Sequence, residues 1–237
     1  MENGATPART APAAVIVAID GPSGTGKSST SRAVAARLGL SYLDTGAQYR
    51  AMTWWLIGNG VDTEDAAAVA TAAAKPSIVS GTDPAAPTIT VDGADAAAPI
   101  RTKDVTSKVS AVSAVPEVRS VITALQRSIA AAATGGIVVE GRDIGTTVLP
   151  DADFKIFLTA SPEARAARRS GELTGKEATD VAATRDALIK RDTADSSRRT
   201  SPLAKADDAV EVDTTELTLQ QVIDCVVTLV EEKRAAG

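Results

Sequence analysis

The sequence predicts an α/β fold in which a parallel β-sheet core is flanked by helices. Three observations lead to this prediction. Short apolar runs alternate with helical patterns, a glycine-rich turn joins the first apolar run to the first helix, and 237 residues suffice for one large domain with inserted lobes. Parallel strands are buried on both faces and form nearly continuous apolar runs. We expect such strands at residues 15–19, 42–43, 137–139, 154–158 and 209–212.

The first half of the chain contains two helices and an insertion. Residues 1–12 are small, polar and proline-containing, so we expect a disordered N-terminal tail. The first helix begins near Lys27 and ends at Gly39, a residue suited to the position after a helix. A second helix is expected over residues 47–57. Turn residues then separate two short strand-like pieces, which predict a β meander in an inserted lobe, at residues 77–80 and 88–91.

The second half returns to the core. Residues 105–133 are helical by pattern, and Pro116 marks a helix start or a kink. Residues 171–175 interrupt two helices, as expected of a lid, and a capping box at Thr218 and Gln221 opens a last helix. Beyond the tail, one domain at 13–237 divides into a core (13–44, 134–160 and 200–237), an inserted lobe (about 45–133) and a lid region (about 161–199).

Composition excludes several classes of function. The chain has no histidine, which removes Ser-His-Asp catalysis, and its single cysteine, Cys225, excludes an intrachain disulfide. The net charge of −5 and 3% aromatic content argue against nucleic-acid binding. No apolar run approaches the roughly 20 residues of a membrane span. We therefore expect a cytoplasmic protein with no nucleic-acid or membrane partner and with small anions as ligands.

The most specific motif is a phosphate loop that follows the first strand. It fits the pattern G-x-x-x-x-G-K-[ST] at Gly21, Pro22, Ser23, Gly24, Thr25, Gly26, Lys27 and Ser28. In such a loop, backbone N–H groups and the positive end of the following helix bind a polyphosphate. Lys27 would reach the outer phosphates, and the Ser28 hydroxyl would bind Mg²⁺. A strand, loop and helix of this kind are typical of P-loop NTPases.

Three further segments are expected near this loop, because ligands of parallel sheets gather at the carboxyl ends of the strands. They are residues 44–50, residues 140–143 and a stretch that contains Arg165, Arg168, Arg169, Arg185, Arg191, Arg198 and Arg199. Guanidinium groups suit phosphoryl oxygens, and phosphoryl transfer needs cations more than it needs a base. A histidine-free kinase is consistent with this set. Asp44 is either a helix cap or a residue that positions Mg²⁺-bound water or substrate.

Together, five motifs resemble those of bacterial cytidylate kinases. They are the phosphate loop, Asp44-Thr-Gly-Ala-Gln-Tyr-Arg50, Ile100-Arg-Thr102, Gly141-Arg-Asp-Ile-Gly-Thr146 and Arg191-Asp192 with Asp195 and Arg198. The resemblance implies transfer of the γ-phosphoryl group of ATP to CMP or dCMP in the presence of Mg²⁺. It also implies a monomeric P-loop kinase with a lobe that binds the nucleoside monophosphate and a short lid.

The resemblance implies a role for each matching residue. ATP would contact Gly21, Pro22, Ser23, Gly24, Thr25, Gly26, Lys27, Ser28 and Ser29, with Arg168 and Arg169 as candidate lid cations. The CMP phosphate would bind Thr45, Arg50, Arg142 and Arg198, the ribose Tyr49, Arg191 and Asp195, and cytosine Ser110, Arg119 and Asp143. Lys27, Arg142, Asp143 and Arg191 would form the catalytic set, and Ser28 would be the metal ligand.

Two alternatives remain open. Another small-molecule P-loop kinase, of the uridylate or shikimate type, would differ only in the acceptor that its inserted lobe binds. A nucleotide-binding switch is the second alternative. Its guanine signature N-K-x-D does not occur, because Asn3 and Asn59 are each followed by glycine.

Overall fold

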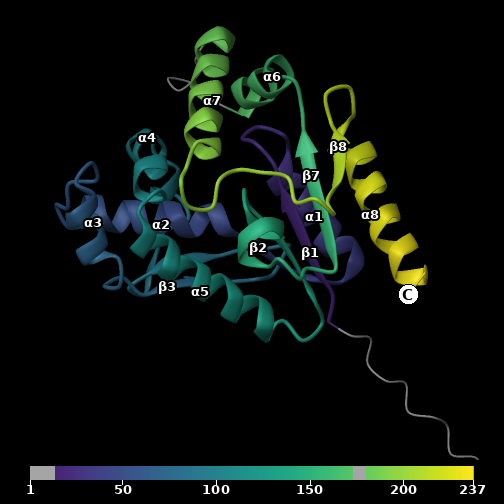
Figure 1. The fold of residues 1–237 in the computed structure, drawn as a ribbon, viewed down its shortest axis with the longest axis horizontal. Coiled ribbons are helices and arrows are strands. Elements are labelled where there is room, and N and C mark those ends of the chain that lie inside the picture. Colours follow the sequence, from purple (N-terminus) through teal and green to yellow (C-terminus); the bar gives the residue numbers. More distant parts are fainter. Residues whose placement is uncertain (1–13, 173–179, 237) are drawn as a thin grey trace, which may run out of the picture.

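The computed structural model describes residues 14–172 and 180–236, so the predicted tail and residues 173–175 lie outside the described residues. Five strands form a parallel sheet in the order β2-β6-β1-β7-β8 (Figure 1). They are β1 Ile16–Asp20, β2 Ser41–Asp44, β6 Ile137–Glu140, β7 Phe154–Thr159 and β8 Val210–Asp213. Each lies within a residue or two of its predicted position. The sheet and its flanking helices confirm the predicted α/β fold.

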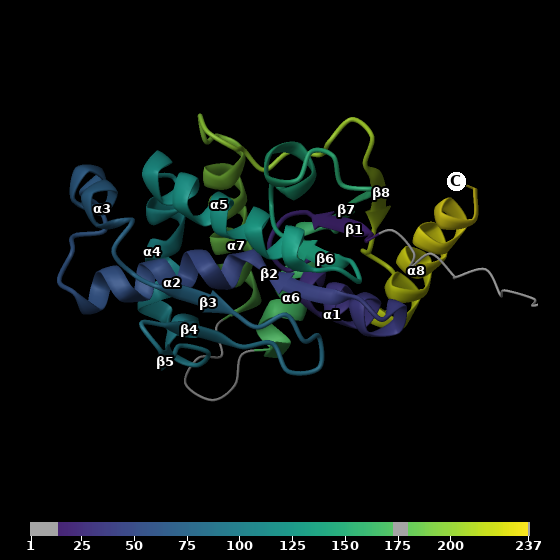
Figure 2. The ribbon, with the colours of Figure 1, turned by 90° about the horizontal axis from the view of Figure 1, so that it is seen from below.

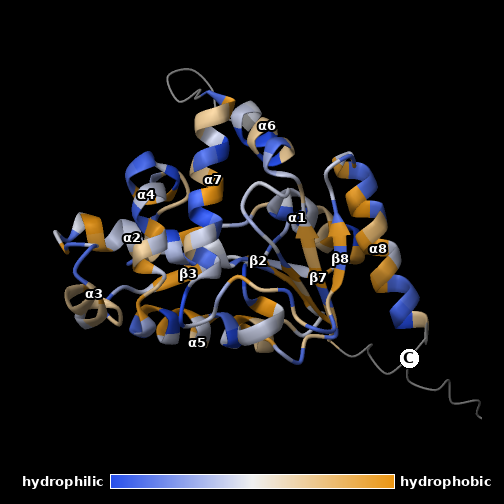
Figure 3. Ribbon diagram, turned by 45° about the horizontal axis from the view of Figure 1, so that its top comes forward, coloured by the Kyte–Doolittle hydropathy of each residue, from blue (hydrophilic) through white to orange (hydrophobic). Residues whose placement is uncertain are grey.

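Two groups of helices bury the two faces of this sheet. Helices α1 (Lys27–Leu38) and α8 (Leu219–Ala236) cover the face that contains Val17 and Ile19. Helix α5 (Pro116–Ala132) and a π-helical turn, η2 (Ile144–Val148), cover the face that contains Ala18. Because side chains alternate along a strand, a nearly continuous apolar run supplies both interfaces. Figure 3 shows hydrophobic strands inside a shell of helices with hydrophilic outer faces.

The ends of α1 and α8 follow the predicted signals. Gly39 closes α1 in the left-handed conformation, with φ of 66°. At the start of α8, the Thr218 N–H donates to Gln221 Oε1 at 2.9 Å, and the Gln221 N–H donates to Thr218 Oγ1 at 3.3 Å. This reciprocal pair is the predicted capping box.

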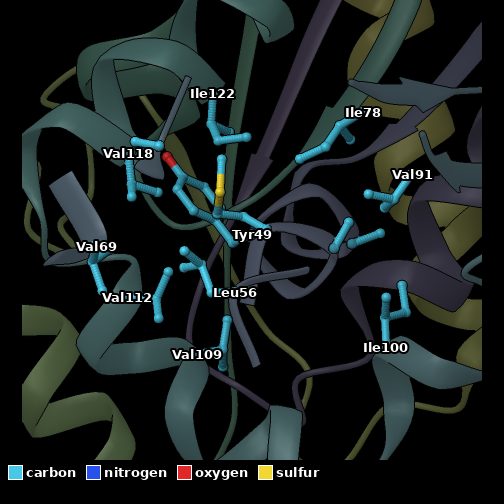
Figure 4. Close-up of a cluster of buried hydrophobic side chains, with 14 of the residues drawn as sticks. Tyr49, Leu56, Val69, Ile78, Val91, Ile100, Val109, Val112, Val118 and Ile122 are labelled. Atoms are coloured by element: carbon cyan, nitrogen blue, oxygen red, sulfur yellow. The ribbon is translucent and has the colours of Figure 1, made fainter. Parts of the chain in front are cut away.

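The insertion between β2 and β6 has its own core. It contains α2 (Thr45–Gly58), α3 (Ala66–Ala72), β3 (Ile78–Ser80), β4 (Ile89–Val91), β5 (Ala94–Asp95), a 3₁₀ turn η1 (Pro99–Arg101), α4 (Lys103–Val112) and α5. Strands β3, β4 and β5 form an antiparallel sheet beside α2 (Figure 2). Tyr49, Leu56 and Ile122 belong to the buried cluster of this insertion, with the Tyr49 ring at its centre (Figure 4). Pro116 starts α5, so the predicted helical region is two helices.

Helices α6 (Pro162–Glu172) and α7 (Val181–Ser196) lie beyond the carboxyl end of β7 (Figure 1). They are therefore on the edge of the sheet where the phosphate loop lies, and α7 contacts α4 of the insertion there. In the described part of the chain, none of the helices combines the length and the apolar character needed to span a bilayer.

Candidate active site

A cavity of about 450 Å³ lies where the phosphate loop, the insertion and the α6–α7 pair meet. All three segments that the sequence places near the loop contribute to it. Its lining includes Ser23, Gly24, Gly26, Lys27, Ser28, Ser29, Asp44, Thr45, Gly46, Tyr49, Arg50, Arg101, Thr106, Val109, Ser113, Arg119, Glu140, Gly141, Arg142, Asp143, Arg169, Arg191, Asp195 and Arg198. The sequence motifs that are far apart in the chain thus share one cavity.

The phosphate loop is shaped by close backbone packing. Gly21 has φ of 144°, and a Cβ at this position would collide with the Leu158 carbonyl oxygen. Gly26 precedes α1 in the left-handed conformation, with φ of 85°. The loop therefore turns directly into α1, whose first N–H groups have no helical partners and face an incoming anion with the positive end of the helix dipole.

Lys27 is buried at the base of this loop. Its Nζ donates to the Pro22 carbonyl oxygen at 2.6 Å. Burial lowers the pKa of Lys27 well below its usual value and Arg142 lowers it further, whereas Glu140 raises it. A polyphosphate beside Nζ would favour the charged form and compete for the ammonium.

Cations outnumber carboxylates in the lining. Eight lysine and arginine side chains face four carboxylates, although the whole chain carries a net charge of −5. Asp195 pairs with both Arg142, at 3.4 Å, and Arg198. Among the residues that the structure describes, the buried Nε of Arg191 has no hydrogen-bond partner, and burial together with Arg142 lowers the pKa of Arg191 to about 10. Such a site favours a strongly anionic ligand.

Arg119, Asp143 and Tyr49 form one part of the cavity lining, and their polar groups could bind a polar ring. Arg119 is 3% exposed; it pairs with Asp143, donates to the Ser113 carbonyl oxygen at 3.2 Å, and lies 5.3 Å above the Tyr49 ring. Burial raises the pKa of the Asp143 carboxyl, and Arg119 opposes this shift. Val109 forms an apolar wall beside these groups. Donors and an acceptor are thus fixed at neighbouring positions.

Asp44 and Arg50 hold the start of α2. Asp44 Oδ1 accepts from the Ala47 N–H at 2.9 Å, and Asp44 Oδ2 pairs with Arg50 at 2.9 Å. The helix-cap interpretation is therefore confirmed, and the same carboxylate also lines the cavity.

Some expected residues lie outside the lining. Gly21, Pro22 and Thr25 shape the loop from behind, and Ser110 lies one turn of α4 before Ser113, which does line the cavity. Arg168 also does not face the cavity. Its guanidinium donates to Thr214 Oγ1 at 2.9 Å and to the backbone carbonyls of residues 214, 215 and 217.

Sequence reasoning missed two groups. Asp20, at the end of β1, accepts from the Ile144 and Gly145 N–H groups at 2.9 and 2.8 Å, and thereby ties the phosphate loop strand to the turn that carries Asp143. Burial raises the pKa of Asp20 to about 6. Its position directly before Gly21 was the available signal. Arg101 lies in the motif at residues 100–102, whose pattern alone indicates no role for it, and its side chain lines the cavity.

The oxygen groups near Ser28 suit Mg²⁺. Glu140 is buried, accepts from the Tyr42 hydroxyl, and lines the cavity with Asp44 and Ser28. Burial and then Asp44 raise the pKa of Glu140, whereas Lys27 lowers it. Within residues 14–172 and 180–236 there is no group of three His, Cys, Asp or Glu side chains that could hold a metal. This donor set fits an ion that is held largely by substrate phosphates and water.

The family model and the curated relatives agree on one family. The family model described as cytidylate kinase matches residues 17–232. A protein named cytidylate kinase from Streptomyces griseus is 81% identical over 232 residues, which cover 98% of this chain and 99% of that protein. Another, from Nocardia farcinica, is 53% identical and covers 94% of this chain and 96% of that protein.

A solved structure shares the fold. It belongs to an uncharacterized protein from Eubacterium ventriosum, with a TM-score of 0.51 and 11% identity, and the match covers 92% of this chain and 98% of the other. At this identity the likeness concerns the fold alone.

Proposed function

The chain belongs to the cytidylate kinase family, and we propose that it transfers the γ-phosphoryl group of ATP to CMP or dCMP. The products are ADP and CDP or dCDP. The observation that carries this proposal is one cavity in which the phosphate loop, an excess of cations and the Arg119–Asp143 pair meet. Two nucleotides bring several negative charges together, and fixed cations are what such a reaction requires.

ATP is bound by the phosphate loop. Its phosphates lie against the N–H groups of the loop and of the start of α1, and Lys27 leaves the Pro22 carbonyl to reach the outer phosphates. Arg169 contributes from the lid region. Arg168 is left out of the ATP set because its guanidinium is held by backbone carbonyls after β8.

CMP occupies the rest of the cavity. Thr45, Arg50, Arg142 and Arg198 bind its phosphate, and Tyr49, Arg191 and Asp195 surround the ribose. Support comes from the buried Nε of Arg191, which has no partner in the described part of the chain, and from the shared position of these side chains in the lining. The insertion at residues 45–133 is accordingly the lobe that binds the nucleoside monophosphate.

Asp143 and Arg119 select cytosine. The exocyclic amine of cytosine donates to a carboxylate, and its N3 and O2 accept from a guanidinium. Uracil presents O4 where cytosine has the amine, so it would leave Asp143 facing an acceptor. Ser110 takes part only if α4 moves toward the base on binding, because Ser113 faces the cavity in this arrangement.

The reaction is an in-line attack by a CMP phosphate oxygen on the γ-phosphorus of ATP. The attacking oxygen is already ionised near neutral pH, so no general base is needed. Lys27, Arg142 and Arg191 neutralise charge on the transferred group, and Asp143 holds the acceptor in place. Mg²⁺ bound with ATP supplies positive charge at the phosphates, and Ser28 would hold it.

The wider setting follows from the family and composition. We place the enzyme in the cytoplasm as a monomer, with ATP and CMP or dCMP as partners and neither nucleic acid nor a membrane. Helices α6 and α7 belong to the lid region at 161–199, of which residues 173–179 lie outside the described residues.

The test is ADP production from ATP and Mg²⁺ with CMP, dCMP, UMP, AMP and shikimate offered separately. We expect turnover with CMP and dCMP. Preference for UMP, AMP or shikimate would overturn the assignment of Asp143 and Arg119. ATP binding without transfer to any acceptor would favour a nucleotide-binding switch instead.

A further inference from the structure

One residue of the phosphate loop, Ser23, is hydrogen-bonded through both its backbone N–H and its backbone carbonyl to the lid region. The Ser23 N–H donates to Asp192 Oδ1 at 3.2 Å, and the Ser23 carbonyl oxygen accepts from Arg165 at 3.1 Å. Arg165 also pairs with Asp192 Oδ2. Arg165 lies on α6 and Asp192 on α7, so both helices are joined to the loop and to each other.

These contacts are shielded from water. The side chains of Arg165 and Asp192 are 7% and 16% exposed. A Cβ at Gly24 would lie 3.1 Å from Arg165 Cβ and 3.2 Å from the Arg165 carbonyl oxygen, so α6 packs directly on the loop. Charge-assisted hydrogen bonds are strong in such surroundings, and mutually bonded groups reinforce one another.

Ser23 precedes the turn of α1 whose free N–H groups face the phosphates. Helix α1 begins at Lys27, and its partnerless N–H groups belong to its first turn. Asp192 therefore holds the loop four residues before that turn, and its carboxylate is already paired with Arg165. The neighbouring residue, Arg191, lines the cavity. A shift of Asp192 would move Arg191 with it.

We propose, resting on the function above, that the Arg165–Asp192 pair is a positioning unit for ATP. It fixes the phosphate loop at Ser23 and sets the place of Arg191 relative to that loop. Neither side chain touches the reacting atoms. The pair acts through the backbone N–H and carbonyl of Ser23 and through α7, so its loss weakens ATP binding before CMP is present.

The test is the Kd of Mg·ATP, measured by calorimetry without CMP, for Asp192→Asn, Arg165→Met and the double variant. We expect each single variant to raise Kd about tenfold, since one charge-assisted pair is lost. The Kd of the double variant should not exceed the Kd of either single variant, because the two residues act as a unit. We also expect kcat to fall, because Arg191 is displaced.

The matched control is Asp186→Asn, on the same helix. Asp186 is exposed and pairs with Arg185, so its Kd should stay within twofold of the wild type. Thermal unfolding separates positioning from a general loss of structure, since Kd is measured far below the midpoint. If Arg165→Met does not fold, Asp192→Asn alone decides.

An Asp192→Asn variant that binds ATP as tightly as the wild type, or more tightly, would overturn the proposal. Tighter binding would mean that Asp192 competes with phosphate for the Ser23 N–H. A wild-type chain that binds no ATP would overturn the proposed function and this role together, whereas wild-type binding with unaltered variants would overturn this role alone.

Discussion

Lys27 is a buried cation whose side chain is fixed by the phosphate loop. It is 6% exposed, and burial lowers the pKa of its ammonium, while its Nζ donates to a loop carbonyl. We expect Lys27→Ala to lower kcat by about 10²–10³-fold, as removal of one preorganised donor commonly does. Steady-state kinetics with CMP would measure this. The control Lys205→Ala removes an exposed pair with Glu211 and should leave kcat unchanged. A Lys27→Ala enzyme that kept most of its activity would refute the ATP assignment.

Asp143 is the residue on which base selection depends. We expect Asp143→Asn to lower kcat/KM for CMP by about 10–100-fold and to lower kcat/KM for UMP less, because a carboxamide can donate to O4. The ratio of the two constants is the readout. An unchanged ratio would show that another group reads the base.

The buried carboxyl of Asp20 predicts a pH effect. Its pKa is raised from 3.8 to about 6. The folded state therefore binds the proton more tightly than the unfolded state, and this contribution to stability is lost as the pH rises from about 4 to 6. Asp20→Asn should remove it. We expect the free energy of unfolding of the variant, relative to wild type, to increase by on the order of 2–3 kcal/mol over that range. Urea unfolding at several pH values would measure this; parallel curves for the two proteins would contradict it.

The capping box at the start of helix α8 stabilises the fold and lies outside the candidate site. It satisfies N–H groups that the helix cannot. Thr218→Ala should cost about 1 kcal/mol and lower Tm by about 2–4 °C, with kcat unchanged. Thr71→Ala is the control, since that exposed hydroxyl donates within its own helix, at 2.8 Å to the Ala67 carbonyl. A Tm loss in both variants would show that the box has no special weight.

The elements with strong local signals were predictable from the sequence. Apolar runs marked the core strands, and Gly39 and Thr218 marked helix ends, because each is a property of a few neighbouring residues. Strand β5 was not predicted. Ala94 and Asp95 have little β propensity and pair only because β4 lies beside them.

The sequence predicted which segments form the candidate site better than it predicted which side chains face the cavity. The motifs named the segments that meet in the cavity, but a helix face is decided by packing between elements. Arg168 thus faces carbonyls after β8, and Ser113 faces the cavity where Ser110 was expected. Asp20 and Asp192 accept from backbone N–H groups distant in sequence, so their partners, unlike their places beside the motifs, could not be read from a local pattern. The roles assigned to individual residues stay predictions.

The molecule as a whole is acidic but concentrates positive charge at one cavity. We expect KM for ATP and for CMP to rise several-fold between about 0.05 and 0.5 M KCl, because added ions screen the attraction. Thermal midpoints at both salt concentrations serve as the control for folding. KM values independent of salt would show that contacts within the closed cavity, and not the field around it, dominate binding.

The strand order has a consequence for how the chain folds during its synthesis. Among the strands in residues 14–172 and 180–236, β1 is synthesised first, yet it lies in the middle of the sheet, and its partners there are β6 and β7, which begin at residues 137 and 154. The insertion, with its own buried cluster, is complete before either partner has been synthesised. During synthesis from the N-terminus, β1 and its phosphate loop therefore have no partner strand while the insertion folds. The nucleotide-binding half of the enzyme is assembled late.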